Sequence, residues 1–389
     1  MEAYIVAGYR SAIGKAKKGG FKNYRSDDLA VDVIRHLASQ VPELDTTKVD
    51  DVIVGCANPE GEQGLQIARL ISARALGKEV PGVTINRYCA SGLEAISMAV
   101  SKVRAGFGHI FVAGGIESMS LIPMTGYKLA PSYKANLDNM NYHVGMGATA
   151  EAVAEKYNIS REASDQFSLE SHTKAANAID KGHFNDEIVP VTVEEVFVEN
   201  GKKVSKSHVV DTDEGVRRDT TLEALSKLRP AFKMGGIVTA GNSSQTSDGA
   251  AFVLVMSEEM VKQLGVKPIA RMVTCTSGGV DPLYMGIGPV EAIPKALDQA
   301  GLKLSDIEQT ELNEAFACQA LAVIQEAGLD PNTVNLNGGA IALGHPLGCT
   351  GAKLTIQLLN EMKRRDQKYG MVTACVGGGQ GIAGIFERL

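Results

Sequence analysis

The most constraining feature of this sequence is that short apolar strands alternate with amphipathic helical segments along the whole chain. Runs rich in β-branched residues at 51–55, 109–113, 252–256 and 370–373 are typical of strands. Helical patterns follow at Ser91–Arg104 and Thr350–Arg365, where apolar residues recur on one face and basic residues end the segment. Strands that alternate with helices predict βαβ units, in which helices cover the sheets.

The two helical patterns resemble copies of one unit. Ser91-Gly92 opens the first and Thr350-Gly351 opens the second, and each leads to a strand and then to a glycine pair, Gly114-Gly115 or Gly377-Gly378. A repeat at an interval of about 260 residues predicts two similar α/β halves that arose by duplication. The alternative is that any two βαβ units look alike at this level of detail.

Between the halves, residues 117–242 are more polar and charged. Helical patterns at 148–157 and 161–181 are followed by a predicted hairpin that turns at Asn200-Gly201. We interpret this stretch as a lid inserted into the first half, because an ordinary surface excursion of about 120 residues would be unusually long. The predicted domains are residues 1–117 with about 248–268, a lid of about 118–247, and residues 269–389.

Composition excludes several classes of protein. The 389 residues can bury a large core without disulfides or metal. With 45 acidic against 39 basic residues and a net charge of -6, the chain is not expected to coat nucleic acid or an anionic membrane. No apolar run approaches the length of a membrane span. The first residues look like a strand rather than a signal peptide, which predicts a cytoplasmic protein. The six cysteines form no C-x-x-C pair, so no metal site is expected.

Cys89 stands directly before the first of the paired helices, in the segment 86–92. The free N–H groups and partial positive charge of a helix N-terminus stabilise a thiolate, which suits a nucleophile. A small buried side chain is the alternative, since most free cysteines have that role.

Three motifs in the second half could complete a site. His345 lies in a Gly-His-Pro loop before the second helix, where the duplication gives it the position that Cys89 has in the first half. Cys375 ends a strand and precedes Gly377, in a loop whose N–H groups could form an oxyanion hole. Asn313 ends another strand, where its amide could hold a water or a carbonyl. A pseudo-twofold axis would bring these loops to one cleft.

The segment 379–384 also fits G-x-G-x-x-G, the fingerprint of dinucleotide-binding folds. Only five residues follow it, which leaves no room for the helix and the distant acidic residue that this fingerprint needs. A dinucleotide site is therefore not expected.

Taken in order, five motifs resemble those of thiolases: N-x-x-C-x-S-G, G-G-x-E-S-M-S, N-E-A-F, G-H-P and C-x-G-G-G-x-G. The resemblance covers essentially the whole chain, although the opening segment 10–15 departs slightly from the usual R-T-P-x-G. It implies an α/β, thiolase-like fold of two duplicated α/β/α halves with covered mixed sheets and an inserted lid. It also implies an acyltransferase with no bound cofactor and no metal, and with coenzyme A (CoA) as co-substrate.

The resemblance implies a role for each motif. Cys89 would attack the substrate and carry the acyl group, and His345 would take the Cys89 proton. Cys375 would protonate the departing acetyl-CoA carbanion and then deprotonate the incoming CoA thiol. His345 and a water held by Asn313 would form one oxyanion hole, and the N–H groups of Cys89 and Gly377 the other.

CoA contacts are implied in the same way. Arg217 would lie by the adenosine end, although it could equally be an ordinary surface arginine. The pantetheine arm would pass Ser244, Met146, Ala315 and Phe316.

Three features favour the degradative subclass, which cleaves 3-ketoacyl-CoA, over the biosynthetic enzymes that form acetoacetyl-CoA. The chain has G-N-S-S-Q-T-S-D-G at 241–249, where biosynthetic enzymes tend to G-N-A-S-G-x-N-D-G. It has Cys349-Thr350 in the histidine loop, and Gly145 where biosynthetic enzymes commonly carry a histidine. A non-catalytic carrier with this fold would have lost a catalytic residue, whereas Cys89, His345 and Cys375 are all present.

We expect 3-ketoacyl-CoA, CoA and acetyl-CoA as ligands, a homodimer or homotetramer, and an association with a hydratase or dehydrogenase of β-oxidation. The lid would supply an apolar pocket for the acyl tail through Leu121, Ile122, Met124 and Leu129. The alternative is that these four residues only pack the lid or a subunit contact.

Overall fold

Eight strands, four in each half, form the centre of the computed structural model, which describes residues 1–389. In the first half these are β1 (Ala3–Ser11), β3 (Asp51–Gly55), β5 (Ile110–Ser118) and β9 (Ser247–Ser257). In the second half they are β10 (Ala270–Gly279), β11 (Gln309–Leu312), β12 (Tyr369–Val376) and β13 (Gln380–Arg388). They lie in one mixed sheet with the order β11-β12-β13-β10-β1-β9-β5-β3-β4, in which β4 (Gly82–Ile85) is an edge strand.

The two halves have the same strand topology. In the first, β3 pairs in parallel with β5, β5 pairs antiparallel with β9, and β9 pairs antiparallel with β1. In the second, β11, β12, β13 and β10 repeat this sequence of parallel, antiparallel and antiparallel pairs. Only the pair Ile5–Ala270, between β1 and β10, joins the two sets. The predicted duplication is therefore confirmed by topology.

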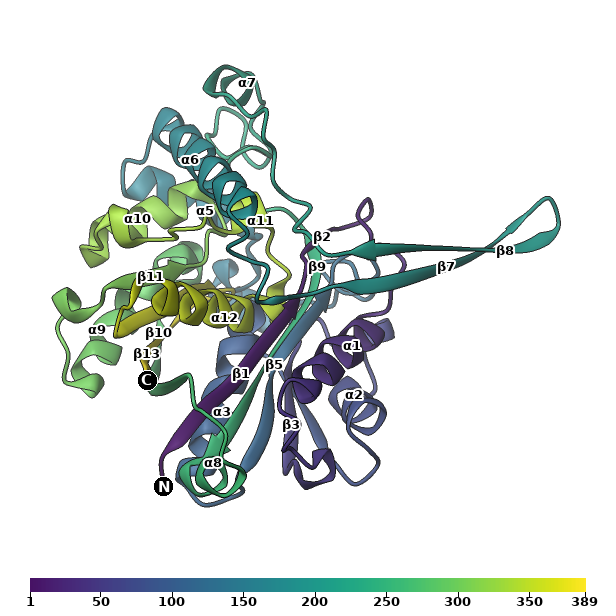
Figure 1. The fold of residues 1–389 in the computed structure, drawn as a ribbon. Helices are drawn as coiled ribbons and strands as arrows, with labels where there is room; N and C mark the ends of the chain where they lie inside the picture. Colours follow the sequence, from purple (N-terminus) through teal and green to yellow (C-terminus); the bar gives the residue numbers. More distant parts are fainter.

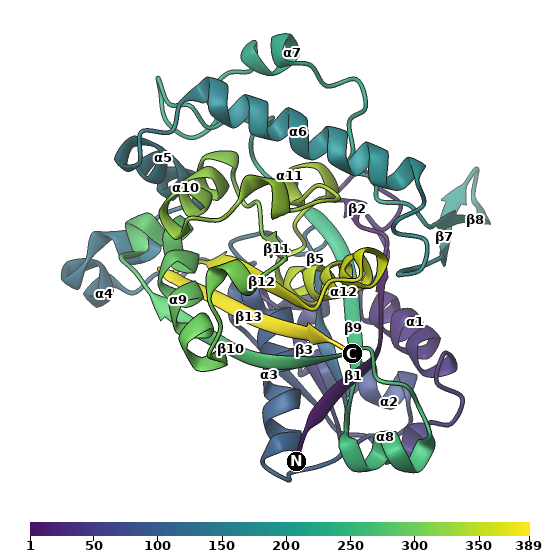
Figure 2. The same ribbon diagram turned by 60° about the vertical axis from the view of Figure 1, so that its left-hand side comes forward.

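Helices cover both sets of strands. The outer helices of the first half are α1 (Ser26–Ser39) and α2 (Ile67–Ala75), and those of the second are α9 (Gly288–Ala300) and α10 (Ala317–Ala327). Between the two sets lie α3 (Ser91–Arg104) and α12 (Leu347–Arg365). The result is a layered α-β-α-β-α molecule (Figures 1 and 2).

Strand β9 shows how side-chain alternation makes these layers. Ala250, Phe252, Leu254 and Met256 pack in the core with α1 and α2. Ala251, Val253 and Val255 face the opposite way, into the core that contains α3 and α12. Because successive side chains of a strand point to opposite faces, an uninterrupted apolar strand predicts a sheet that is buried on both sides.

Helices α3 and α12 cross at glycines, which allows their backbones to approach closely. A methyl group added to Gly92 would lie 2.7 Å from the backbone nitrogen of Ala352, and one added to Gly351 would lie 2.4 Å from that of Leu93. Gly92 lies in the first turn of α3 and Gly351 in the second turn of α12, so the crossing places the two helix N-termini near each other.

Residues between β5 and β9 form the lid. It contains α4 (Tyr133–Asp138), α5 (Met146–Lys156), α6 (Arg161–Asp180), β6 (Ile188–Val189), β7 (Val191–Glu199), β8 (Lys202–Val210) and α7 (Leu222–Ser226). Helix α6 lies across α10 and the short α11 (Ala340–Leu343) of the second half (Figure 2). The domain boundaries given above stay a prediction.

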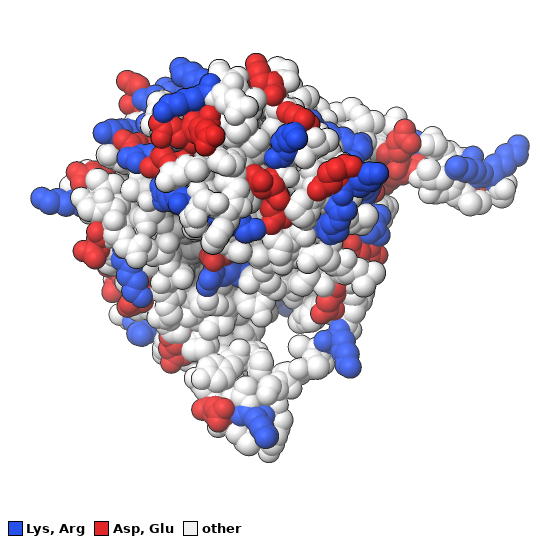
Figure 3. Space-filling model, turned by 90° about the horizontal axis from the view of Figure 1, so that it is seen from below, with Lys and Arg blue, Asp and Glu red and all other residues white.

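The hairpin of β7 and β8 projects from the body of the molecule (Figure 1). Its turn is formed by Asn200 and Gly201, both with positive φ, as predicted for a two-residue Asn-Gly loop. On the face seen in Figure 3, acidic and basic side chains are interspersed over the body and the hairpin. No helix is both long enough and apolar enough to span a membrane.

Candidate active site

The loop before Cys89 is fixed by a set of hydrogen bonds. Cys89 lies in a 3-10 turn, Tyr88–Ala90, that leads directly into α3. The Ser91 hydroxyl donates to the Tyr88 carbonyl at 2.7 Å and accepts from the Arg87 N–H at 2.8 Å. The Arg87 guanidinium binds Glu94 at 2.8 Å and Gln380 at 3.0 Å. These contacts hold Tyr88 at a φ of 44°, a conformation that a bulky residue seldom adopts.

Burial, rather than the helix terminus, decides the ionisation of Cys89. Burial raises the pKa of the Cys89 thiol to about 12, although the backbone N–H groups of Gly377 and of Cys89 itself favour the thiolate. The buried Glu117 carboxylate raises the pKa further. The structure therefore differs from the expectation of a thiolate in the resting protein. A base must take the proton when the sulfur reacts.

Cys375 shares this site. It is the penultimate residue of β12 and is fully buried, and Gly377 follows two residues later. Burial raises the pKa of the Cys375 thiol above its ordinary value, and the neighbouring Cys89 sulfur raises it further. The structure thus brings Cys89, Cys375 and Gly377 together, as the sequence motifs predicted.

The hydrogen bonds of His345 define its tautomer. Its Nδ1 lies 2.6 Å from Oγ1 of Thr350, and this hydroxyl donates its only proton to the Pro346 carbonyl at 2.9 Å. Thr350 can therefore only accept from the ring, which places the imidazole proton on Nδ1. The basic nitrogen is then Nε2, which lies 3.3 Å from Nδ2 of Asn313.

His345 is neutral in this environment. Burial lowers the pKa of its imidazole to about 3, and the positive charge of the buried Lys353 lowers it in the same direction. Oδ1 of Asn313 is buried and has no hydrogen-bond partner among the protein groups. An amide with one free acceptor beside Nε2 can hold a small donor such as a water, which is what the sequence motif implied.

Most of the predicted CoA contacts lie around the two cysteines. Ala315, Phe316 and Cys375 belong to one apolar cluster, and the partly buried Met146 packs against it. The Ser244 N–H donates to the Ala315 carbonyl at 3.0 Å. A methyl group added to Gly377 would lie 3.7 Å from Sδ of Met146. The Phe316 ring also contacts Phe232 edge-on, with 6.0 Å between centroids. Sequence reasoning missed Phe232, which no motif marks.

Arg217 lies apart from these residues, on an exposed loop of the lid. Its N–H donates to Nδ1 of His172 on α6 at 3.2 Å. The neighbouring Arg218 forms an ion pair with Asp180, whereas the structure gives Arg217 no ion pair. Its guanidinium is therefore available to an anion.

Three further residues hold the loops of the site, and sequence reasoning did not assign these roles to them. Glu117 accepts from the Ala57 N–H at 2.8 Å and from the Gly348 N–H at 2.9 Å, and so links the two halves. Glu314 accepts from Ser171, Asn335 and the Ile341 N–H, and so fixes the start of α11 beneath His345. Thr350 orients the imidazole. The sequence did contain a sign of the two glutamates, because an acidic residue within an apolar segment, such as Glu117 or Glu314, usually has a specific partner.

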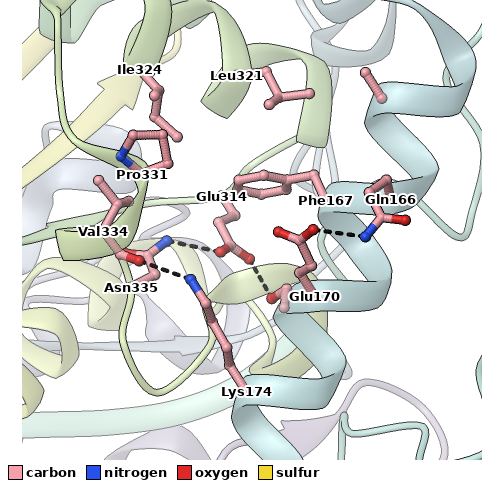
Figure 4. Close-up of a pocket in the computed structure, with 12 residues that line it drawn as sticks. Gln166, Phe167, Glu170, Lys174, Glu314, Leu321, Ile324, Pro331, Val334 and Asn335 are labelled. Atoms are coloured by element: carbon pink, nitrogen blue, oxygen red, sulfur yellow. Dashed lines mark hydrogen bonds between the residues drawn. The ribbon is translucent and has the colours of Figure 1, made fainter.

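A separate pocket lies behind Glu314, between α6 and α10 (Figure 4). Its volume is about 250 Å³, and Phe167, Leu321 and Ile324 form its apolar wall. It contains none of the side chains predicted for catalysis or CoA binding. No group of three or more His, Cys, Asp or Glu side chains is arranged to hold a metal ion.

Comparisons with known proteins agree with this geometry. Residues 3–259 match the thiolase N-terminal domain and residues 266–388 match the thiolase C-terminal domain. A 3-ketoacyl-CoA thiolase of Bacillus subtilis (strain 168) is 52% identical in an alignment of 389 residues that covers 99% of each chain. One of Marinobacter nauticus is 44% identical over all of this chain and 98% of its own. A crystal structure of the Bacillus anthracis acetyl-CoA acetyltransferase superposes with a TM-score of 0.89 at 40% identity, and covers 100% of this chain and 99% of its own.

The chain belongs to the thiolase family. It is accordingly an acyltransferase, with CoA as its co-substrate. The fold predicted from the motifs is confirmed.

Proposed function

We propose that this protein is a 3-ketoacyl-CoA thiolase of fatty acid β-oxidation. It uses CoA to cleave a 3-ketoacyl-CoA into acetyl-CoA and an acyl-CoA that is two carbons shorter. The observation that carries the proposal is that two buried thiols, Cys89 and Cys375, lie close enough together for the Cys89 sulfur to raise the pKa of Cys375, while the Gly377 N–H favours the Cys89 thiolate.

The first half reaction breaks the carbon–carbon bond. Nε2 of His345 takes the Cys89 proton as the sulfur attacks the 3-keto carbon. The bond between C2 and C3 then breaks, and Cys375 gives its proton to the acetyl-CoA carbanion. The products are acetyl-CoA, an acyl group on Cys89, a protonated His345 and a Cys375 thiolate.

The second half reaction releases the shortened chain. The Cys375 thiolate takes the proton of the CoA thiol, whose sulfur attacks the acyl-Cys89 thioester. As the tetrahedral intermediate collapses, His345 returns its proton to the Cys89 sulfur. Both cysteines and the histidine are then in their starting states, so protons and bonds balance over the cycle.

Backbone and amide groups stabilise the negative charge that develops on oxygen. The N–H groups of Cys89 and Gly377 form one oxyanion hole for the acyl carbonyl. His345 and a water held by Asn313 form the other, at the acetyl-CoA thioester carbonyl. Removal of one oxyanion-hole donor typically costs about 10²–10³ in kcat.

CoA binds from the lid side. Met146, Ser244, Ala315 and Phe316 line the pantetheine path next to Cys375. The unpaired guanidinium of Arg217 supplies positive charge for the phosphates at the adenosine end. The substrate is a thioester whose anionic phosphate groups lie far from the reacting bond.

The degradative subclass is favoured by the relatives named 3-ketoacyl-CoA thiolase, which share up to 52% of their residues with this chain. The structural relative named acetyl-CoA acetyltransferase is 40% identical. It represents the second candidate, which condenses two acetyl-CoA molecules.

Steady-state thiolysis of C4, C6, C8 and C12 3-ketoacyl-CoA at fixed CoA tests the proposal. Each buried methylene contributes up to about 0.8 kcal/mol, so kcat/KM should rise over several carbons if the tail has an apolar site. Activity confined to C4 would favour the acetyl-CoA-condensing alternative. The lid cluster of Leu121, Ile122, Met124 and Leu129 stays a hypothesis for the tail site, and only Ile122 of the four is fully buried.

The proposed function also includes an oligomeric state and a cellular compartment. We expect at least a homodimer in the cytoplasm, acting alongside a hydratase or dehydrogenase of β-oxidation. Sedimentation that shows only a 41.1 kDa monomer at micromolar concentration would contradict the oligomer.

A further inference from the structure

Gln245 connects two loops that serve different parts of the substrate. Its side-chain Nε2 donates to the Gly215 carbonyl at 2.9 Å and lies within 3.2 Å of the Ile341 carbonyl and 3.4 Å of the Ala342 carbonyl. Its own backbone carbonyl accepts from the His345 N–H at 3.1 Å. One residue therefore touches the lid loop that leads to Arg217, the helix α11, and the histidine itself.

Hydrogen bonds hold the lid loop 213–217 at both of its ends. At its start, the Asp213 carboxylate binds the Arg10 guanidinium and the Ile13 N–H, all of them buried. At its end, the Arg217 N–H donates to His172. Between these anchors, the backbone of Gly215 approaches α11 so closely that an added methyl group would lie 2.2 Å from the Ala342 carbonyl. The Gln245 amide lies beside this close contact.

The loop that carries His345 is held from the same side. After α11, the chain turns at Gly344, and the His345 N–H donates to the Gln245 carbonyl and to the Ser247 hydroxyl at 3.2 Å. The Ser247 hydroxyl in turn donates to the Gln245 carbonyl at 2.8 Å. These contacts form a continuous path from Gly215 through the Gln245 side chain to α11, whose end lies two residues before the imidazole.

We propose that Gln245 is a positioning residue that couples the nucleotide end of CoA, bound at the Arg217 loop, to the orientation of His345. This inference rests on the proposed function of Arg217 and His345 in a CoA-dependent reaction. Binding energy from a remote part of a substrate can be used at the reacting centre, in which case truncation of the substrate lowers kcat and not only affinity. The Gln245 amide is the physical link by which this occurs here.

The inference also gives a physical account of a residue that marks the subclass. In the biosynthetic pattern a glycine occupies the position of Gln245, and a glycine cannot bridge Gly215 and α11. In such an enzyme the two loops would be connected only through their backbones.

Gln245→Met tests the link without opening a cavity, because methionine has a similar length and no N–H donor. Gln245→Glu replaces the donor by a carboxylate that faces three carbonyl oxygens, and Gln245→Gly reproduces the biosynthetic residue. All three leave the backbone bond between residue 245 and His345 in place. The control is Gln299→Met, on the exposed face of α9. Melting temperatures establish that each variant is folded.

The decisive measurement compares each variant on acetoacetyl-CoA and on acetoacetyl-pantetheine, which lacks the nucleotide, with CoA and pantetheine as the matching thiols. In the wild type, truncation should lower kcat by on the order of tenfold, in addition to raising KM. In Gln245→Met, kcat with acetoacetyl-CoA should already be lower by a similar factor, and truncation should then raise only KM. Gln245→Glu should show the larger loss and Gln299→Met none.

Several results would overturn the inference. A Gln245→Met enzyme whose kcat ratio for the two substrates equals that of the wild type would show that no coupling passes through the amide. A change confined to KM would make Gln245 a simple binding residue. A wild-type kcat that is unaffected by truncation would mean that there is no coupling to transmit. A wild-type protein inactive on acetoacetyl-CoA would instead refute the proposed function itself.

Discussion

Two features of its surroundings have opposite effects on the pKa of the Cys89 thiol. Burial raises the pKa of the thiol to about 12, while the N–H groups of Gly377 and Cys89 favour the thiolate. Because an acid with a raised pKa holds its proton at neutral pH, Cys89 rests as a thiol. The neutral His345, whose pKa is lowered to about 3, is ready to accept that proton over the whole range in which the protein is expected to work.

Brief alkylation by iodoacetamide should therefore label Cys89 slowly at pH 7, and the rate should continue to rise to pH 9 without a plateau. Cys89 and the partly exposed Cys275 are the accessible thiols, because the other four cysteines are at most 2% exposed. Mass spectrometry of the wild type and of Cys275→Ala, with and without acetyl-CoA, checks this. Acetyl-CoA should protect Cys89 only. A rate that levels off below pH 7 would show a thiolate in the resting protein.

Cys375→Ser should retain acyl transfer to Cys89 but lose most turnover. A serine hydroxyl is far less acidic than a thiol, so it is a poor proton donor to the departing carbanion. Proton transfer by a placed side chain is worth about 10²–10⁴-fold, and kcat should fall in that range. Acyl-enzyme formation from acetyl-CoA, followed by mass spectrometry, should persist in this variant and vanish in Cys89→Ala. Near wild-type thiolysis by Cys375→Ser would show that His345 alone handles the protons.

At the scale of single elements, hydrophobic periodicity was sufficient to predict which segments form helices and strands, but it was insufficient to predict where they begin and end. The helix predicted at 91–104 is α3, and the hairpin at Asn200-Gly201 is present. Helix α12 begins at Leu347, three residues before the predicted start, because the Cys349 and Thr350 N–H groups already donate to the Pro346 carbonyl. The 3-10 turn that holds Cys89 depends on contacts of Arg87 with Gln380, distant in sequence. The same limit applies to Thr350 and Gln245, whose roles arise only when separate loops meet.

The crossing of α3 and α12 should be sensitive to a single methyl group. In Gly351→Ala the new methyl would lie 2.4 Å from the backbone of Leu93, so the helices must separate. Overpacking of this kind typically costs about 1–3 kcal/mol. Since Cys89 and His345 precede these two helices, kcat should fall more than the loss of stability explains at 25 °C. Chemical denaturation and kcat of Gly351→Ala, compared with Ser101→Ala on the exposed face of α3, check this. A destabilised variant with full kcat would show that the crossing does not position the site.

At the scale of the whole molecule, a buried ionic cluster joins the lid to the rest of the chain. Arg10 on β1 binds Glu187 at 2.7 Å and Asp213 at 2.7 and 2.9 Å, and both carboxylates belong to the segment between β5 and β9. Asn360 on α12 donates to the second oxygen of Glu187 at 3.1 Å. Buried charges are costly to remove from water, and they are stabilising only while each has its partner. The cluster therefore makes the position of the lid depend on a complete set of charges.

Arg10→Met should lower the free energy of unfolding by an amount that depends on pH. Burial already raises the pKa of Glu187, and Arg10 opposes this, so loss of Arg10 raises that pKa further. A carboxyl whose folded-state pKa exceeds its unfolded value loses stability as pH rises above the unfolded pKa of 4.5. The variant should thus lose about 3–5 kcal/mol of unfolding free energy at pH 8 and clearly less at pH 5.

Urea unfolding followed by circular dichroism at both pH values measures this loss. Arg10→Met combined with Glu187→Gln and Asp213→Asn removes all three charges. This triple variant should recover part of the stability and lose the added pH dependence, whereas equal destabilisation of Arg10→Met at both pH values would contradict the argument.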